Sequence, residues 1–284
     1  MFNKIKYQLI KIIENIPQLQ ILIYNHLSKF KFLFPHDKDY LALKLLFNKN
    51  EKRDFIDVGG NIGLSTIGFR ELGFKNNTIH VFEPDKLLIR KYLRKLKKYY
   101  KKIKIYEYGL SSKNSEMKLY KAFYKNKYFH FNNSFDIKYI KNKIKENYPD
   151  IYNQFNFKSQ SLKLKKFDTL NFKFRACFVK IDVEGLDHKV LEGMIKYINK
   201  NKPIMLIEYN HSNFKIIYNK IKSNFHCYRY EIEKNMLMKL NSNQIKSLLI
   251  GDILEKKYKK NSVNLYYIHK KFDFVRSKKT SSLK

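Results

Sequence analysis

The chain has 284 residues, enough for one large α/β domain with added elements, and 44% of its residues are hydrophobic. With 22 Tyr and 23 Phe, it carries enough apolar surface to offset the entropy of ordering, which excludes wholesale disorder. The formal net charge of +34 is compatible with an anionic partner, but a lysine-rich composition is also what a strongly AT-rich genome produces.

Residues 1–50 are predicted to be a helical extension. Apolar residues recur at steps of three and four from Ile5 to Ile16, Pro17 breaks the pattern, and a second apolar stretch runs from Leu19 to Leu33. We expect these stripes to pack on the domain; the alternative is that the basic first stripe lies on an anionic membrane surface. The chain shows no signal-peptide core and no run of ~18 apolar residues. A soluble cytoplasmic protein is expected, with peripheral attachment to the inner face of the membrane as the alternative.

From Asp54 the pattern changes to short apolar runs that alternate with helical segments, which is typical of βαβ units. Residues 51–272 are therefore predicted to form one Rossmann-like α/β domain with a mostly parallel central sheet. Its first predicted elements are strand Phe55–Val58, helix Leu64–Leu72, strand Thr78–Phe82, helix Lys86–Tyr100 and strand Ile103–Tyr108.

The alternation stops over residues 111–170, which we interpret as an insertion before the fourth strand, serving as a lid or binding segment. A short helix over the sheet is expected at Ile137–Ile144. The insertion is rich in aromatic residues, which we expect to pack it onto the core, although stacking on sugars or bases is an alternative. They include Phe123, Tyr124, Tyr128, Phe129 and Phe131.

The alternation then resumes. The predicted elements are strand Ala176–Ile181, helix His188–Asn199, strand Pro203–Ile207, helix 212–224 and a closing strand pair at Tyr228–Ile232 and Val263–Ile268. Residues 273–284 are expected to be a solvated basic tail. The two cysteines, Cys177 and Cys227, lack metal-ligand spacing and fit a reducing cytosol.

A glycine-rich turn follows the first strand and opens a helix. Glycines let the backbone turn sharply and approach a ligand closely, and a helix N-terminus directs free amides toward an anion. The methionine carboxylate of S-adenosylmethionine is such an anion; the alternative is merely a tight connection. The predicted cofactor-binding residues of this turn are Asp57, Gly59, Gly60, Asn61 and Gly63.

Glu83 ends the second strand, twenty residues after Gly63. A carboxylate there can accept hydrogen bonds from both ribose hydroxyls of a bound nucleoside. The glycine spacing departs from the strict GxGxxG pattern of dinucleotide folds, and Asp57 would be unfavourable beside a pyrophosphate. Because a sulfonium and an α-ammonium suit that acidic charge, the pattern favours S-adenosylmethionine over NAD.

Three carboxylates are predicted at the same edge of the sheet. Asp182 and Glu184 end the fourth strand on one side of it, and Glu208 ends the fifth. Neighbouring carboxylates can hold a divalent cation or support chemistry at a hydroxyl. The alternative is that Asp182 and Glu184 cap the next helix or pair with Lys180 and Lys189.

Residues 54–210 resemble the FkbM family of methyltransferases. The matching segments, in family order, are DFIDVGGNIG, HVFEPD, NNSF, KFDTL, VKIDVEGLDHKVLEG and PIMLIEYN. The resemblance implies a Rossmann-like class I methyltransferase fold that uses S-adenosylmethionine, in a family whose members commonly O-methylate sugars or secondary-metabolite hydroxyls. The family most often has Ala where Gly60 stands, and the stretch between NNSF and KFDTL is long and lysine-rich for it.

Methyl transfer to a hydroxyl requires alignment of the oxygen with the methyl carbon and removal of the proton. By position Asp182 is the preferred base and is also placed among the cofactor-binding residues, with Glu184 orienting the substrate or helping to hold a metal. His211 and His188 lie close enough to the predicted edge to be further candidates, while the other histidines show no constellation. Ser111, after the third strand, is placed to approach the adenine, unless it only forms a turn.

We therefore expect an S-adenosylmethionine-dependent O-methyltransferase acting on a sugar, a glycan precursor or a similar small metabolite. A nucleic-acid methyltransferase is the main alternative, which the charge supports and the absence of an Asn/Asp-Pro-Pro-aromatic tetrapeptide argues against. A non-catalytic, membrane-associated protein retaining the fold is a second alternative. No metal site is assigned, and a divalent cation at the carboxylates stays open.

Overall fold

A computed structural model describes residues 16, 17, 19, 35–183, 185–251 and 264–272. The predicted N-terminal stripes up to residue 33, apart from those three positions, the predicted basic tail and Glu184 lie outside the described residues. Within this part of the chain, no helix combines the length and the apolar character needed to cross a membrane.

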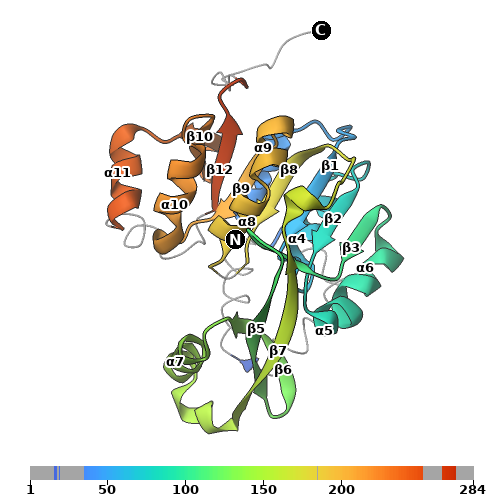
Figure 1. Cartoon of the computed structure of the whole chain (residues 1–284), viewed down its shortest axis with the longest axis vertical. Coiled ribbons are helices and arrows are strands. Elements are labelled where there is room, and N and C mark those ends of the chain that lie inside the picture. The colour runs from blue at the N-terminus through green and yellow to red at the C-terminus, as the bar shows by residue number, and fades with distance from the viewer. Residues whose placement is uncertain (1–15, 18, 20–34, 184, 252–263, 273–284) are drawn as a thin grey trace.

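The centre of the molecule is an eight-stranded sheet with the order β11-β10-β12-β9-β8-β1-β2-β3. Strands β3, β2, β1, β8 and β9 pair in parallel, whereas β12 runs antiparallel to both β9 and β10. The Rossmann-like α/β fold with its closing strand pair is therefore confirmed (Figure 1). The strands are β1 Asp54–Val58, β2 Ile79–Phe82, β3 Ile103–Tyr106, β8 Ala176–Ile181, β9 Ile204–Glu208, β10 Phe225–Glu231, β11 Met236–Lys239 and β12 Asn264–His269.

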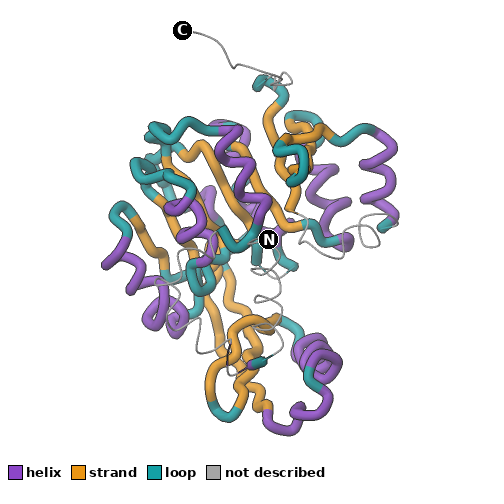
Figure 2. Tube along the Cα trace, turned by 180° about the vertical axis from the view of Figure 1, so that it is seen from behind, coloured by secondary structure: helices purple, strands orange, loops and turns teal. Residues whose placement is uncertain are grey.

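Helices lie against the large sheet both in the view of Figure 1 and in the view from behind in Figure 2. Phe55 and Phe178 face one apolar cluster, which α4 joins, while Ile56 and Val179 face the other, which α8 to α11 join. Successive residues of each strand thus point to opposite faces of the sheet, and both faces are buried. This explains why the strand sequences are nearly continuously apolar. The helices are α4 Leu64–Glu71, α5 Lys86–Leu88, α6 Arg94–Tyr99, α8 Asp187–Gly193, α9 Ile195–Asn201, α10 His211–Ile221 and α11 Ser242–Ile250.

Two predicted helices are interrupted. A π-helical turn, Ile89–Leu93, separates α5 from α6. The helix predicted over His188–Asn199 breaks after Gly193, where a Cβ atom would lie 2.0 Å from the carbonyl oxygen of Ser111. A close backbone contact from another part of the chain therefore marks the break, and no local sequence pattern reveals it.

The insertion has regular secondary structure, although its sequence shows no alternation of short apolar runs and helical segments. It forms a second sheet of order β4-β7-β5-β6, and Figure 1 shows this sheet extending away from the large one. The predicted short helix exists as α7, but it packs on the second sheet through Ile140 and Ile144 and does not cover the large sheet. The elements are β4 Gly109–Leu110, β5 Ser115–Tyr124, β6 Lys127–Ser134, α7 Ile137–Asn147 and β7 Phe155–Lys165.

The aromatic residues of the insertion mainly serve packing. Tyr124 and Phe129 are buried in the cluster beneath α7, and Tyr128 is buried on the side of the large sheet. Phe123 is half-buried against that same core, whereas the side chain of Phe131 lies outside the description.

Residues 35–47 also pack on the domain, through the 3-10 helix Lys38–Ala42 and α3, Leu43–Leu46. Tyr40 is buried against Phe69 of α4, with ring centroids 5.3 Å apart. This brings His36 close to the carboxyl edge of the large sheet.

Candidate active site

A cleft with an empty volume of about 980 Å³ opens at the carboxyl ends of β1, β2 and β8. The glycine loop, the turn that carries Glu83 and the end of β8 line one side of it, and β5, β6 and β7 of the second sheet line the other. Open α/β sheets bind ligands in this crevice.

The glycine loop is packed tightly between two neighbouring strands. Gly59 has a φ of +82°, and a Cβ atom there would lie 1.9 Å from the carbonyl oxygen of Asp182. At Gly60 a Cβ atom would lie 2.2 Å from a methyl group of Val81. Gly63 also has a positive φ, and it faces Leu96 of α6 and not the cleft. Glycine is thus required at position 59, where the obstacle is backbone.

Several amides of the glycine loop are bonded within the protein. The N–H groups of Gly59 and Gly60 donate to the carbonyl of Phe82, and that of Gly63 donates to the carbonyl of Gly60. The first turn of α4 keeps amides without helical partners, as expected of a helix N-terminus that faces an anion. Two residues of that turn, Leu64 and Ser65, line the cleft.

Glu83 directly follows β2, as the sequence predicts, and its side chain lies against the glycine loop. Its carboxylate accepts the N–H groups of Asn61 (2.7 Å) and Asp85 (2.8 Å). Burial raises the pKa of Glu83 to about 7, and these two hydrogen bonds act in the opposite direction. Because a carboxylate offers about four lone-pair sites, it can still accept from two hydroxyl groups.

The side-chain oxygen of Asn61 is the second polar group available in the cleft. Oδ1 is buried and has no hydrogen-bond partner among the described residues, and Asn61 lines the cleft. A buried acceptor without a partner calls for a donor from a ligand. Ribose hydroxyls and an α-ammonium are such donors, so Asn61 and Glu83 fit S-adenosylmethionine.

Asp57 is placed differently from the expectation. Its carboxylate is fully buried, accepts the hydroxyls of Ser65 and Thr66 (both 2.9 Å), and is not part of the cleft surface. Burial raises its pKa, and the nearby Lys180 opposes this shift. Asp57 therefore fixes the start of α4 from behind the loop and does not face a sulfonium.

Lys180 joins β8 to the glycine loop. Its buried ammonium lies 3.1 Å from Asp182 Oδ2 and 3.6 Å from Asp57 Oδ1, and it donates to the carbonyl of Gly59 (3.3 Å). Burial would lower the pKa of Lys180, but Asp182 and Asp57 together outweigh it and raise the pKa. The ion pair that the sequence suggested is thus present, and Lys180 stays charged.

Of the predicted catalytic residues, the structure places only Asp182 at the cleft. Its side chain is 41% exposed and lines the wall beside the glycine loop. Glu184 lies outside the described residues. Glu208 at the end of β9 and His211 at the start of α10 do not line the cleft, and a ring nitrogen of His211 lies 3.3 Å from the carbonyl oxygen of Leu249.

Ser111 is also absent from the cleft surface. It is buried, and its carbonyl packs against Gly193. The preceding residues Gly109 and Leu110 line the cleft in its place. A Cβ atom at Gly109 would lie 2.6 Å from Leu164 and 3.3 Å from Pro84, so Gly109 is tightly packed between these two side chains.

Several cleft residues were not selected from the sequence. His36 reaches the cleft from the N-terminal segment, and Asn133 and Phe135 reach it from the end of β6. Asn133 and Phe135 belong to the NNSF segment, so the family resemblance was the only signal for them. Three leucines of the second sheet complete an apolar wall: Leu119, Leu162 and Leu164.

No group of three or more His, Cys, Asp or Glu side chains in the described part of the chain is arranged to hold a metal ion. Among these described residues, which do not include Glu184, nothing supports a divalent cation at the predicted carboxylates.

A family model described as a methyltransferase FkbM domain matches residues 57–240. Among solved structures, methyltransferase FkbM from Methylobacillus flagellatus KT is 14% identical, with a TM-score of 0.48, and the match covers 93% of this chain and 58% of that one. Precorrin-6y C5,15-methyltransferase from Geobacter metallireducens GS-15 is 10% identical, with a TM-score of 0.35 and coverages of 80% and 86%. No curated protein matches the chain.

Proposed function

The chain belongs to the FkbM methyltransferase family, and on that premise we propose that it transfers the methyl group of S-adenosylmethionine to a hydroxyl of a sugar, a glycan precursor or a similar small metabolite. One observation carries the proposal: Asn61, Glu83 and Asp182 meet in a single cleft at the carboxyl edge of the sheet.

Three groups of the chain are suited to hold the cofactor, whose sulfonium supplies an electrophilic methyl group. Glu83 accepts the ribose hydroxyls with the lone pairs that the backbone leaves unused. Asn61 Oδ1 accepts a further donor, and the first-turn amides at Leu64 and Ser65 bind the carboxylate.

Asp182 is the proposed base. The acceptor hydroxyl donates to its carboxylate, and Asp182 takes the proton as the new oxygen–carbon bond forms and the sulfur–carbon bond breaks. Lys180 is a positioning residue in this scheme, since its ammonium holds one carboxylate oxygen of Asp182 and leaves the side chain partly exposed.

The two walls of the cleft differ in polarity. The carboxylates lie on the large sheet, whereas Leu119, Leu162 and Phe135 form an apolar wall on the other side. An acceptor with a hydroxyl on one side and an apolar face on the other fits between them.

The test is incubation of the protein with methyl-labelled S-adenosylmethionine and separated pools of glycan precursors, small metabolites, lipids and RNA. Label is expected in the glycan or small-metabolite pool and not in that pool with Asp182→Asn. Label in RNA alone would replace the proposal with nucleic-acid methylation. Absence of cofactor binding in a calorimeter would contradict the whole assignment.

A further inference from the structure

A second cavity lies at the opposite edge of the large sheet. Its empty volume is about 970 Å³, including space open to solvent, and it is lined by residues 167, 168 and 171–175 and by α9. Because β8 begins at Ala176 and ends just before Asp182, this groove lies roughly 20 Å from the cleft, at ~3.3 Å per strand residue. It is no part of the active site.

Four cations surround the groove: Lys173, Arg175, Lys196 and Lys200. All four residues are exposed, and none forms an ion pair with another described residue. The only acidic residue in the lining is Asp168, whose carboxylate oxygens accept the N–H groups that begin α9, at 2.9 and 3.0 Å. The carboxylate of Asp168 thus caps α9, while the four cations face solvent.

The floor of the groove is aromatic and rigidly held. The ring of Phe174 stacks on that of His80, with centroids 3.6 Å apart and planes 19° apart. The hydroxyl of Tyr197 accepts the N–H of Ala176 (2.7 Å) and donates to the carbonyl of Phe174 (3.3 Å). Phe172 is half-buried beside Phe174. The groove is therefore formed before any ligand arrives.

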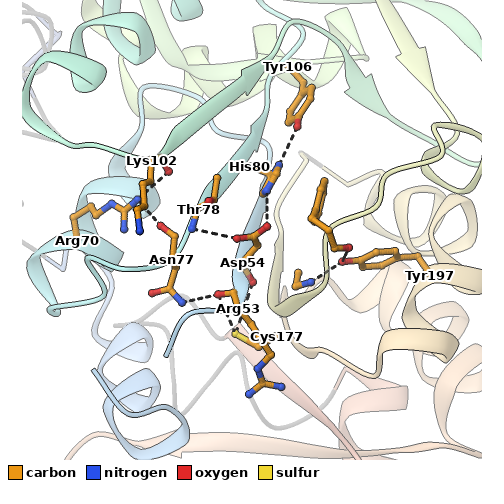
Figure 3. A network of polar contacts seen from close by, with 12 residues as sticks. Arg53, Asp54, Arg70, Asn77, Thr78, His80, Lys102, Tyr106, Cys177 and Tyr197 are labelled. Atoms are coloured by element: carbon orange, nitrogen blue, oxygen red, sulfur yellow. Dashed lines mark hydrogen bonds and ion pairs between the residues drawn. The ribbon is translucent and has the colours of Figure 1, made fainter. Parts of the chain in front are cut away.

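Residues of the large sheet hold the aromatic floor of the groove in place. Figure 3 shows His80 between Asp54 and Tyr106, with hydrogen bonds of 3.0 and 2.9 Å, and Tyr197 beside the entry of β8. These partners fix the plane of the imidazole on which Phe174 rests.

We propose that this groove binds a nucleotide unit, with its phosphates on the four cations and its base against Phe172 and Phe174. The fork of Arg175 matches phosphate oxygens, and lysines add point charges. An aromatic floor adds stacking with a planar base, which a phosphate alone does not use. Free nucleotides and single-stranded RNA share this chemistry.

The experiment measures binding of ADP, pyrophosphate and a fluorescent hexa-adenylate to the full chain. We expect the nucleotide probes to bind and ADP to bind at least about fivefold more tightly than pyrophosphate, since stacking contributes roughly 1 kcal/mol or more. Competition between ADP and the hexa-adenylate distinguishes the two ligand classes: a free-nucleotide site prefers ADP, and an RNA site prefers the hexamer. Equal binding of ADP and pyrophosphate would overturn the aromatic part of the proposal.

The groove variant is Lys173→Glu, Lys196→Glu and Lys200→Glu. The matched control makes the same change at Lys95, Lys97 and Lys98, which are exposed on α6 far from the groove in sequence. We expect at least about a tenfold loss for the groove variant and a much smaller loss for the control, because only the former removes phosphate contacts.

Equal losses in both variants, or no binding of any probe to the unaltered protein, would overturn the proposal. A circular dichroism spectrum and S-adenosylmethionine binding unchanged in the groove variant establish that it is folded. Since the readout is nucleotide binding and not methyl transfer, its outcome is separate from that of the proposed function.

Discussion

The ammonium of Lys121 lies 2.6 Å from Oδ2 of Asp85, and both side chains are buried. The hydroxyl of Tyr128 donates to the same oxygen (2.9 Å). Lys121 and Tyr128 belong to the second sheet, whereas Asp85 caps α5 two residues after Glu83. This ion pair therefore joins the second sheet to the turn that carries the proposed ribose-binding carboxylate.

Replacing Lys121 with Met should lower the free energy of unfolding by about 3 to 5 kcal/mol, because it leaves the buried Asp85 carboxylate without its cation. Urea denaturation measures this loss. The double variant Lys121→Met with Asp85→Asn should regain part of it, since no uncompensated charge remains. A single variant as stable as the unaltered protein would show that the pair does not hold the second sheet.

Gly59→Ala and Gly60→Ala should differ sharply. At Gly59 the added Cβ meets a backbone carbonyl at 1.9 Å and the φ is +82°, so we expect loss of S-adenosylmethionine binding together with a destabilisation of about 1 to 3 kcal/mol. At Gly60 the obstacle is the side chain of Val81, and the double variant with Val81→Ala should bind the cofactor normally. Calorimetry measures the affinity; normal binding by Gly59→Ala would contradict the packing argument.

Glu83 should make both stability and cofactor affinity depend on pH. Its folded pKa is about 7, above the ordinary value of 4.5, so its stabilising contribution is complete below pH 4.5 and is lost as the pH rises through 7. Glu83→Gln removes this pH-dependent contribution. The free energy of unfolding of the variant, relative to that of the unaltered protein, should therefore increase between pH 5 and 8. The charged carboxylate is the better acceptor for ribose hydroxyls, so cofactor affinity should rise over the same range.

These trends are followed by urea denaturation and calorimetry at pH 5, 6, 7 and 8. Glu83→Gln serves as the control for the unaltered protein, because its affinity for the cofactor should be nearly constant with pH. An equal pH slope in both proteins would assign the titration to another group.

Asp182→Asn should reduce turnover by about 10²- to 10⁴-fold while leaving cofactor affinity nearly unchanged, since it removes the proposed base and keeps the shape of the side chain. Initial rates with labelled cofactor measure the effect. Glu208→Gln and His211→Ala are matched controls, because neither residue lines the cleft, and both should retain turnover. Full activity of Asp182→Asn, or loss of activity in the controls, would move the base elsewhere.

The second sheet shows why part of the fold escaped sequence analysis. The strand Ser115–Tyr124 turns Leu119 and Lys121 toward the large sheet and Ala122 and Tyr124 toward α7, so both faces of β5 are buried in its second half. A buried lysine breaks the apolar alternation that identifies a strand. Its partner, Asp85, comes from another element, and a local pattern does not contain it.

The sequence by itself determined the parallel core, the glycine turn and the position of Glu83. Each of these depends on residues close together in the chain, through apolar runs, turn chemistry and the distance from one strand end to the next. Only the tertiary structure decided that Asp57 lies behind the loop, that Asp182 reaches the cleft while Glu208 does not, and that a cationic groove forms at the far edge. Those outcomes depend on the packing of distant segments, whose register and orientation are fixed only when the sheets and helices bury their faces together.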